Sequence, residues 1–185
     1  IARSNDAMLR ISMALPEYPD LQELLDYVSS EIKRLLGTEA ALVTLLDEEA
    51  GELFFQSVSY EDTTTGKRVK ETRFPLDQLI AGRVIKSGEP LIVSDVSRDR
   101  EIHEARDRKL GYQTHNLLLV PLRSIDRIIG VIAAINKKNG DFDQTDVELL
   151  SMIAATVVLS IENARFSDEI RRAYREVSDL NRAKD

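Results

Sequence analysis

Two neighbouring apolar runs in the middle of the chain constrain its fold more than any other feature. The runs Asn116–Leu122 and Arg127–Asn136 are rich in leucine, isoleucine and valine, and a polar turn at Ser124–Asp126 joins them. Extended runs of this composition, separated by a short turn, are typical of paired strands. We therefore expect them to form the central hairpin of a sheet.

A second hairpin is expected before this one. Ala40–Leu46 is apolar and partly β-branched, the segment 47–51 is rich in turn residues, and Glu52–Tyr60 resumes an extended pattern. The polar, threonine-rich stretch Glu61–Lys70 then predicts an exposed connection, which leads to a short strand around Thr72–Pro75.

Helical periodicity marks the beginning of the chain. A short helix is expected within Ser4–Leu15, before two prolines. Asp20 followed by Glu23 resembles a capping box, and a continuous apolar stripe then runs to Gly37. This pattern predicts a second helix over Leu21–Leu36.

The segment between the two hairpins contains both a helical and a strand-type pattern of apolar residues. Apolar residues recur helically over Leu79–Ile85, the stretch Ser87–Pro90 is a strong stop, and Leu91–Val93 reads as a short strand. Asp95–Tyr112 is highly charged, so we expect a loop that contains one exposed helix.

The last helix continues beyond the point where a domain should close. Asp143 and Asp146 cap its start, and one apolar face runs to Ile161. Alternating spacings of three and four then continue through Asn163, Phe166, Ile170, Ala173, Val177 and Leu180. These residues have no remaining core to cover, which favours a parallel coiled coil over packing within the chain. We expect Ile170, Ala173, Val177 and Leu180 to form a homodimer interface, which the first helix could join.

This order of elements predicts one α+β domain with an antiparallel sheet. We divide the chain into an N-terminal signalling helix (1–19), the domain itself (20–166) and a C-terminal coiled-coil signalling helix (167–185). Because the sequence begins with Ile1 in a helical pattern, we expect it to be a segment of a longer protein.

Composition excludes several classes of function. The chain has 25 Lys and Arg against 32 Asp and Glu and no concentrated basic block, so nucleic acid and anionic membranes are not expected partners. It has no cysteine, which removes disulfides, thiolate metal sites, cysteine nucleophiles and thioether-linked chromophores. No apolar run reaches the roughly 18 residues of a membrane span, and no signal peptide is evident, so we expect a cytoplasmic protein without direct membrane insertion.

Two stretches carry a family resemblance. The run "FPLDQLIAGRVIKSGEPLIVSDVSRD", Phe74–Asp99, resembles the middle signature of GAF domains, and "NLLLVPLRSIDRIIGVIAAINKK", Asn116–Lys138, is similar to their paired central strands. With the last helix, the resemblance covers Asp20–Phe166. It implies a six-stranded antiparallel sheet, with terminal helices packed on one face and a ligand pocket under mobile loops on the other.

One further motif resembles cyclic-nucleotide-binding members of the family. It consists of Asn136, Lys137, Phe142 and Asp146, but Val147 stands where the motif has a final glutamate. In the family the motif acts chiefly as a structural clasp beside the pocket, and the simplest interpretation here is a strand end, a turn and a capped helix. The resemblance therefore leaves the cofactor unknown, with a cyclic nucleotide open as a ligand.

Ligand contacts are expected near the loop after Leu91–Val93, where this fold places ligand-facing residues. Tyr112 and Phe74 flank it and could stack on a planar ligand; the alternative is core filling, which is the favoured interpretation of Phe74. The candidate ligand contacts are Phe74, Ser94, Asp95, Arg98, Tyr112 and His115. His103, on the exposed helix, is expected to be solvated, and no metal site is expected because no second ligand stands at a suitable spacing.

No catalytic constellation is recognisable, so we expect a regulatory fragment rather than an enzyme. The closing run Leu180–Asp185 resembles the lead into the phosphoacceptor helix of bacterial sensor histidine kinases. The first hypothesis is thus a small-molecule-sensing module of such a kinase, linked to an output domain through dimeric helices. The second is a ligand-free dimerisation and signal-relay domain, whose own side chains fill the pocket.

Overall fold

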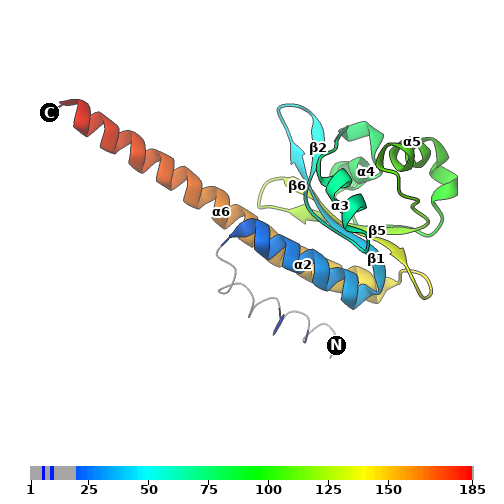
Figure 1. The fold of residues 1–185 in the computed structure, drawn as a ribbon. Coiled ribbons are helices and arrows are strands. Elements are labelled where there is room, and N and C mark those ends of the chain that lie inside the picture. Colours follow the sequence, from blue (N-terminus) through cyan, green and yellow to red (C-terminus); the bar gives the residue numbers. More distant parts are fainter. Residues whose placement is uncertain (1–5, 7–8, 11–19, 185) are drawn as a thin grey trace.

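The computed structural model describes residues 6, 9, 10 and 20–184. The helix expected within Ser4–Leu15, and with it most of the region 1–19, lies outside the described residues. A single antiparallel sheet forms the centre of the molecule, with helices on both faces (Figure 1). The expected α+β architecture with a six-stranded sheet is confirmed.

The two predicted hairpins lie side by side in the sheet. Its order is β3-β2-β1-β6-β5-β4. In the β5–β6 hairpin Leu117 lies opposite Ile135, and β6 also pairs with β1, where Leu42 lies opposite Ala133. The strands are β1 (Thr38–Asp47), β2 (Glu52–Tyr60), β3 (Arg73–Pro75), β4 (Leu91–Val93), β5 (Leu117–Arg123) and β6 (Ile128–Lys137).

Helices α2 (Leu21–Leu36) and α6 (Gln144–Lys184) cover one face of the sheet, as the amphipathic patterns predicted. The Asp20 carboxylate caps α2 by accepting a hydrogen bond from the backbone N–H of Gln22 at 2.8 Å, and Gly37 ends the helix in the left-handed conformation with φ 64°. The buried sides of both helices pack on alternate residues of the central strands to form the first core.

Shorter elements cover the opposite face. They enclose a second core, separated from the first by the sheet itself. These elements are α3 (Thr63–Lys70), the 3₁₀ helices η1 (Leu76–Gln78) and η2 (Val96–Asp99), α4 (Ala81–Ser87) and α5 (Arg100–Leu110). The loop with one helix expected over Asp95–Tyr112 corresponds to η2, α5 and the segment that follows.

The exposed connection predicted over Glu61–Lys70 is wrong, because most of it forms α3. The Asp62 carboxylate caps the helix by accepting from the backbone N–H groups of Thr64 and Thr65. Val69 is fully buried against the sheet. A single buried apolar residue in a polar stretch leaves no detectable periodicity, although the aspartate followed by threonines is a recognisable start signal.

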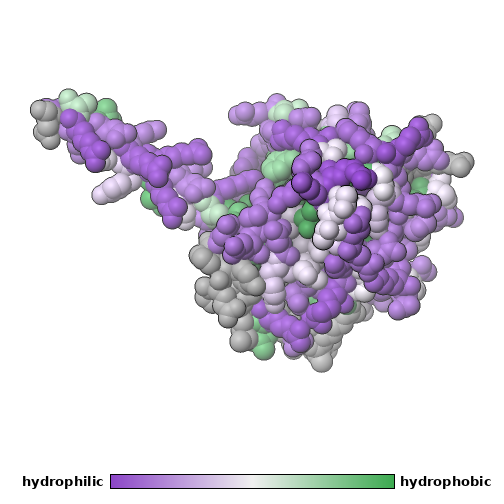
Figure 2. All heavy atoms as spheres, viewed as in Figure 1, coloured by the Kyte–Doolittle hydropathy of each residue, from purple (hydrophilic) through white to green (hydrophobic). Residues whose placement is uncertain are grey.

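Helix α6 leaves the domain after Ile161, the last buried residue that it contributes. Its C-terminal part projects away from the sheet (Figure 1), with scattered hydrophobic side chains on a hydrophilic surface (Figure 2). By length and composition α6 could also cross a membrane, but the segment from Asp146 to Ile161 packs its buried side on the sheet. This arrangement is that of a core helix.

Candidate ligand-binding site

A small cavity lies between the sheet and the start of α4. Its volume is about 30 Å³, which is room for about two water molecules. Most of its wall is apolar, and Thr44 and Arg106 are its two polar residues. The lining residues are Leu42, Thr44, Phe55, Leu79, Ile80, Ala81, Arg106, Leu117, Leu119, Ala133 and Ile135.

Arg106 brings a charge to the cavity from α5. Only 7% of the residue is exposed. Its Nη1 donates to the Thr114 hydroxyl at 2.9 Å and lies 3.5 Å from the Asp107 carboxylate. Asp107 also accepts from the backbone N–H of Thr114 at 2.8 Å and from its hydroxyl at 3.0 Å. These contacts fix the segment after α5 to the end of the helix.

The Tyr60 side chain adds a second buried polar group beside Arg106. Burial raises the pKa of its phenol, and the neighbouring Arg106 guanidinium opposes that rise. The hydroxyl has no hydrogen-bond partner of good geometry in the part of the chain that the structure describes. Its ring packs edge-on against Tyr112, with centroids 4.9 Å apart. The region around Arg106 therefore holds polar capacity that the protein itself uses only in part.

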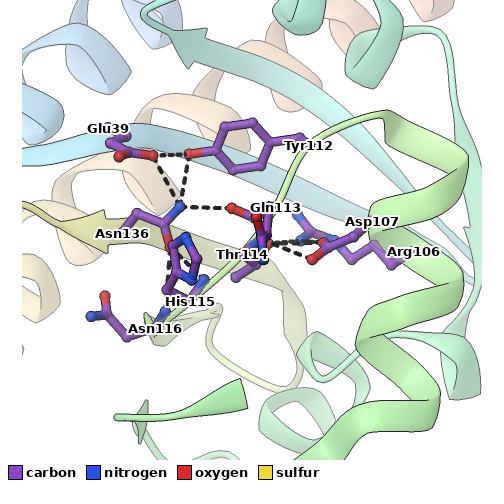
Figure 3. A network of polar contacts seen from close by, with 9 residues as sticks. All are labelled: Glu39, Arg106, Asp107, Tyr112, Gln113, Thr114, His115, Asn116 and Asn136. Carbon is purple, nitrogen blue, oxygen red and sulfur yellow. Dashed lines mark hydrogen bonds and ion pairs between the residues drawn. The ribbon is translucent and has the colours of Figure 1, made fainter. Parts of the chain in front are cut away.

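Asn136 ties the segment between α5 and β5 to the sheet (Figure 3). The residue is buried at the end of β6 and has a positive φ of 57°. Its side-chain carbonyl accepts from the backbone N–H groups of His115 and Asn116, at 2.7 and 3.3 Å. Its amide nitrogen lies 2.9 Å from the Gln113 carbonyl oxygen and 3.0 Å from the Glu39 carboxylate. One side chain thus holds three residues of the segment.

Glu39 and Tyr112 complete this network (Figure 3). The Tyr112 hydroxyl donates to the Glu39 carboxylate at 2.6 Å and accepts from the Asn136 amide at 3.0 Å. Partial burial raises the pKa of Glu39, but hydrogen bonds from Tyr112 and Asn136 outweigh burial and leave that pKa lowered. Burial and the adjacent carboxylate raise the pKa of Tyr112. Glu39 is thus ionised and Tyr112 is protonated at neutral pH.

The motif that begins at Asn136 forms a clasp between β6 and α6. The Lys137 ammonium lies 2.5 Å from the Asp146 carboxylate, which is fully buried and also accepts from the backbone N–H of Asp143. Asp143 in turn accepts from the backbone N–H of Asp146 at 2.9 Å and caps the helix. The Lys137 ammonium also lies 5.8 Å from the centre of the Phe142 ring. These contacts attach the end of the sheet to the start of α6.

The six candidate ligand contacts all lie away from the cavity wall. Phe74 is buried and packs edge-on against Phe55 at 6.1 Å, while the side chains of Ser94, Asp95 and Arg98 are exposed. Tyr112 belongs to the Asn136 network, and the side chain of His115 is exposed although its backbone is held. Direct ligand contacts from these six stay a prediction.

Sequence reasoning missed the two charged residues that the structure makes most distinctive, Arg106 and Glu39. Arg106 stands in a run of charged residues that is typical of a solvated helix, and nothing in such a run marks the one that turns inward. Two other residues did have recognisable patterns in the sequence. Asp62 has the pattern of a helix cap, and Asn136 belongs to a motif of the family. Among the residues that the structure describes, no three His, Asp or Glu side chains cluster as a metal site requires.

The sheet thus has a pocket on one face and the helices α2 and α6 on the other. A family model described as "GAF domain" matches residues 19–162, and the chain belongs to this family. GAF domains are regulatory, non-catalytic domains that sense small molecules in signalling proteins, in agreement with the expectation of a non-enzymatic fragment.

Known proteins agree with this assignment. The chain is 33% identical over 150 residues to the probable 3',5'-cyclic phosphodiesterase pde-5 of Caenorhabditis elegans, covering 76% of this chain and 20% of that protein. It is 31% identical over 123 residues to a cGMP-specific 3',5'-cyclic phosphodiesterase of Drosophila virilis, covering 65% and 14%. The chain thus spans about a fifth or less of these relatives.

A solved structure supports the same fold. The GAF domain from a phosphoenolpyruvate-protein phosphotransferase of Coxiella burnetii matches with a TM-score of 0.77, over 91% of this chain and 98% of that one, at 18% sequence identity.

Proposed function

We propose that this GAF domain senses a small molecule in the cavity beside α4 and α5, and passes the signal through α6 to an output domain. The observation that carries the proposal is the cavity itself, because Arg106 and Thr44 converge on an otherwise apolar space. Pockets that combine an apolar wall with a few placed polar groups are typical of ligand sites.

The sheet offers a short path from cavity to signalling helix. Neighbouring residues of a strand point to opposite faces, so Ala133 and Ile135 line the cavity while Ala134 between them packs in the core under α2 and α6. The clasp from Lys137 to Asp146 joins the same strand to α6. A ligand that shifts β6 would therefore shift the start of α6.

The projecting part of α6 supports a parallel homodimer. Ile170, Val177 and Leu180 are 54%, 58% and 66% exposed, and Ala173 is exposed between them. The same heptad frame extends back onto the domain through Leu159, which is 66% exposed. Pairing with the α6 of a second copy would bury this stripe along about 27 Å of helix, from Asn163 to Leu180.

The domain would act in the cytoplasm as part of a larger signalling protein. The closing run Leu180–Asp185 favours a histidine kinase as the output. The curated relatives are instead phosphodiesterases, but the likeness covers a fifth or less of their length, so it concerns the regulatory part. A cyclic nucleotide stays among the ligands to be tested.

The small volume of the cavity favours a second candidate function. At about 30 Å³ the space is too small for a nucleotide unless α4 or α5 moves. A ligand-free dimerisation and relay domain would keep its cavity at this small volume.

A thermal-shift screen separates the two candidates. The 185-residue chain would be tested with cyclic nucleotides, nucleotides, haem, amino acids and small organic acids, because a ligand of the folded state raises its melting temperature. We expect a saturable rise with one class, and its loss in Ala133→Leu, which fills the cavity. The relay function is supported if no class raises the melting temperature, and a rise that Ala133→Leu leaves unchanged places the ligand elsewhere.

A further inference from the structure

Arg106 is an unusual residue for the wall of an apolar cavity. Its guanidinium always carries a positive charge, and burying a charge is costly unless other groups compensate it. Most of the surrounding wall consists of aliphatic side chains such as Leu117, Leu119 and Ile135. An arginine that served only to fill space here would be less favourable than a leucine or methionine of similar volume.

The protein's own groups compensate this charge only in part. A guanidinium has five N–H donors. Among the described residues, Nη1 of Arg106 contacts Thr114 and Asp107, and the Tyr60 hydroxyl lies beside the guanidinium as a third polar neighbour. The one paired carboxylate, Asp107, is 3.5 Å away and divides its two oxygens between bonds to Thr114. The guanidinium therefore retains the capacity to bind a further acceptor.

The buried Tyr60 hydroxyl is a second polar group in this region, although Tyr60 is not among the residues that line the cavity. It lies beside the guanidinium and has no partner of good geometry among the described residues, although Tyr60 is only 7% exposed. A buried hydroxyl without a partner is unfavourable by an amount similar to a lost hydrogen bond. Two polar groups, on α5 and β2, thus lie next to each other, and one of them, Arg106, is part of the cavity wall.

We propose that the cavity binds a short aliphatic monocarboxylate, with the carboxylate on Arg106 and Tyr60 and the alkyl group against the apolar wall. This proposal rests on the proposed function, since it uses the same cavity. Planar carboxylates match the guanidinium in a two-point hydrogen bond. A monocarboxylate brings one negative charge and two oxygens, whereas phosphate and sulfate would bring further unpaired oxygens against aliphatic side chains.

The size of the space limits the alkyl group. Room for about two water molecules corresponds to an acid such as acetate or propionate, with little movement of the protein. A longer alkyl chain would require the cavity to enlarge. The parts of its wall that could shift are the residues Leu79 to Ala81 at the start of α4, and α5 with Arg106. Both are short elements outside the central strands, so enlargement would leave the sheet register unchanged.

Calorimetric titration of the 185-residue chain with sodium propionate tests the proposal. Propionamide is the matched control, because it has nearly the same shape without the charge, and sodium phosphate at equal ionic strength tests for a general anion site.

We expect propionate to bind and neither control compound to bind. Arg106→Gln should weaken the affinity for propionate about 10- to 100-fold, the range for a lost charged hydrogen bond. Thr114→Val removes the hydroxyl contact of Arg106 but keeps the charge, so it should retain most of the affinity.

A second measurement protects the test against a variant that fails to fold. In the unmodified chain, nuclear Overhauser contacts should connect the propionate methyl group to the methyl groups of Leu117 and Leu119. Equal binding of propionamide, stronger binding of phosphate, contacts outside the cavity, or full affinity in a folded Arg106→Gln variant would each overturn the proposal. If propionate does not bind but another compound does, and Ala133→Leu abolishes that binding, the sensor function stands and only the carboxylate proposal fails.

Discussion

At the scale of single residues, Asn136 controls the geometry of the segment that borders the cavity. Its positive φ of 57° aims the side chain at the backbone of residues 113–116, where it contacts Gln113, His115 and Asn116. Asparagine is among the few non-glycine residues that adopt this conformation readily. The same residue thus provides both the backbone turn and the hydrogen bonds.

Replacing this side chain separates the two contributions. Asn136→Ala loses the hydrogen bonds and strains the backbone, so we expect the free energy of unfolding to fall by about 2–4 kcal/mol. Asn136→Gly is the matched control, because glycine adopts a positive φ without strain, and it should be less destabilising by about 1 kcal/mol. Urea denaturation measures both. If Asn136→Ala were as stable as the unmodified protein, the hydrogen bonds of Asn136 would not contribute to the stability of the fold.

Glu39 makes the same network sensitive to pH. Hydrogen bonds lower its pKa in the folded state below the ordinary value of 4.5, so its stabilising contribution is present above that pH and is lost as the pH falls through the folded-state pKa. We expect Glu39→Gln to be less stable than the unmodified protein at neutral pH, and the difference to disappear between about pH 5 and pH 3.

Chemical denaturation over this range measures the effect. Glu49→Gln, in the exposed turn between β1 and β2, is the control and should leave the profile unchanged. A difference between Glu39→Gln and the unmodified protein that stayed constant down to pH 3 would show that the carboxylate charge does not matter.

At the scale of elements, close backbone contacts set the position of the helices over the cavity. A Cβ atom at Gly82 in α4 would lie 2.1 Å from the Leu76 carbonyl oxygen of η1, so only glycine allows these elements to meet. At Gly66 in α3 a Cβ would find ordinary contacts, the nearest at 3.7 Å to Val58. The two glycines therefore have different roles in similar short helices.

Alanine at these positions should have opposite effects. Gly82→Ala must push α4 away from η1, so we expect it to lower the free energy of unfolding by about 1–3 kcal/mol and to enlarge the cavity opening. Gly66→Ala should be neutral or stabilising by up to about 1 kcal/mol, because alanine is the better helix former. Thermal denaturation of both variants checks this, and a Gly82→Ala protein as stable as Gly66→Ala would contradict the close approach.

Elements with strong periodicity could be predicted from the sequence, and contacts between them could not. Helix α2 and strand β2 have the predicted bounds, because an apolar stripe or a strand pattern between clear stops defines each. Helix α3 was missed because Val69 is the one apolar residue among its polar neighbours. The inward turn of Arg106 depends on how α5 packs over the second core, and this is a tertiary property without a local signal.

At the scale of the whole molecule, the sheet separates a small cavity from a long helix that projects from the domain. The cavity residues and the residues under α6 alternate along β6, so the proposed function needs only a shift of this strand to link the two faces of the sheet. After Ile161, α6 contributes half-buried residues such as Ala164 and Arg165, and from Phe166 onward its side chains are mostly exposed. Under the proposed function, this exposed part pairs with a second copy and relays the signal.

The double substitution Ile170→Asp and Val177→Asp tests this arrangement. Both side chains are more than half exposed, at 54% and 58%, in a region that contributes nothing to either core, so the domain should remain folded with an unchanged melting transition of its sheet. Charges at core positions of a coiled coil prevent pairing, and we expect a monomer. Arg175→Asp, which changes charge on the opposite side of the same helix, should leave the dimer intact. Sedimentation equilibrium distinguishes the outcomes: if the unmodified chain is a dimer that survives the double substitution, its interface lies on the globular domain and α6 does not carry the signal through pairing.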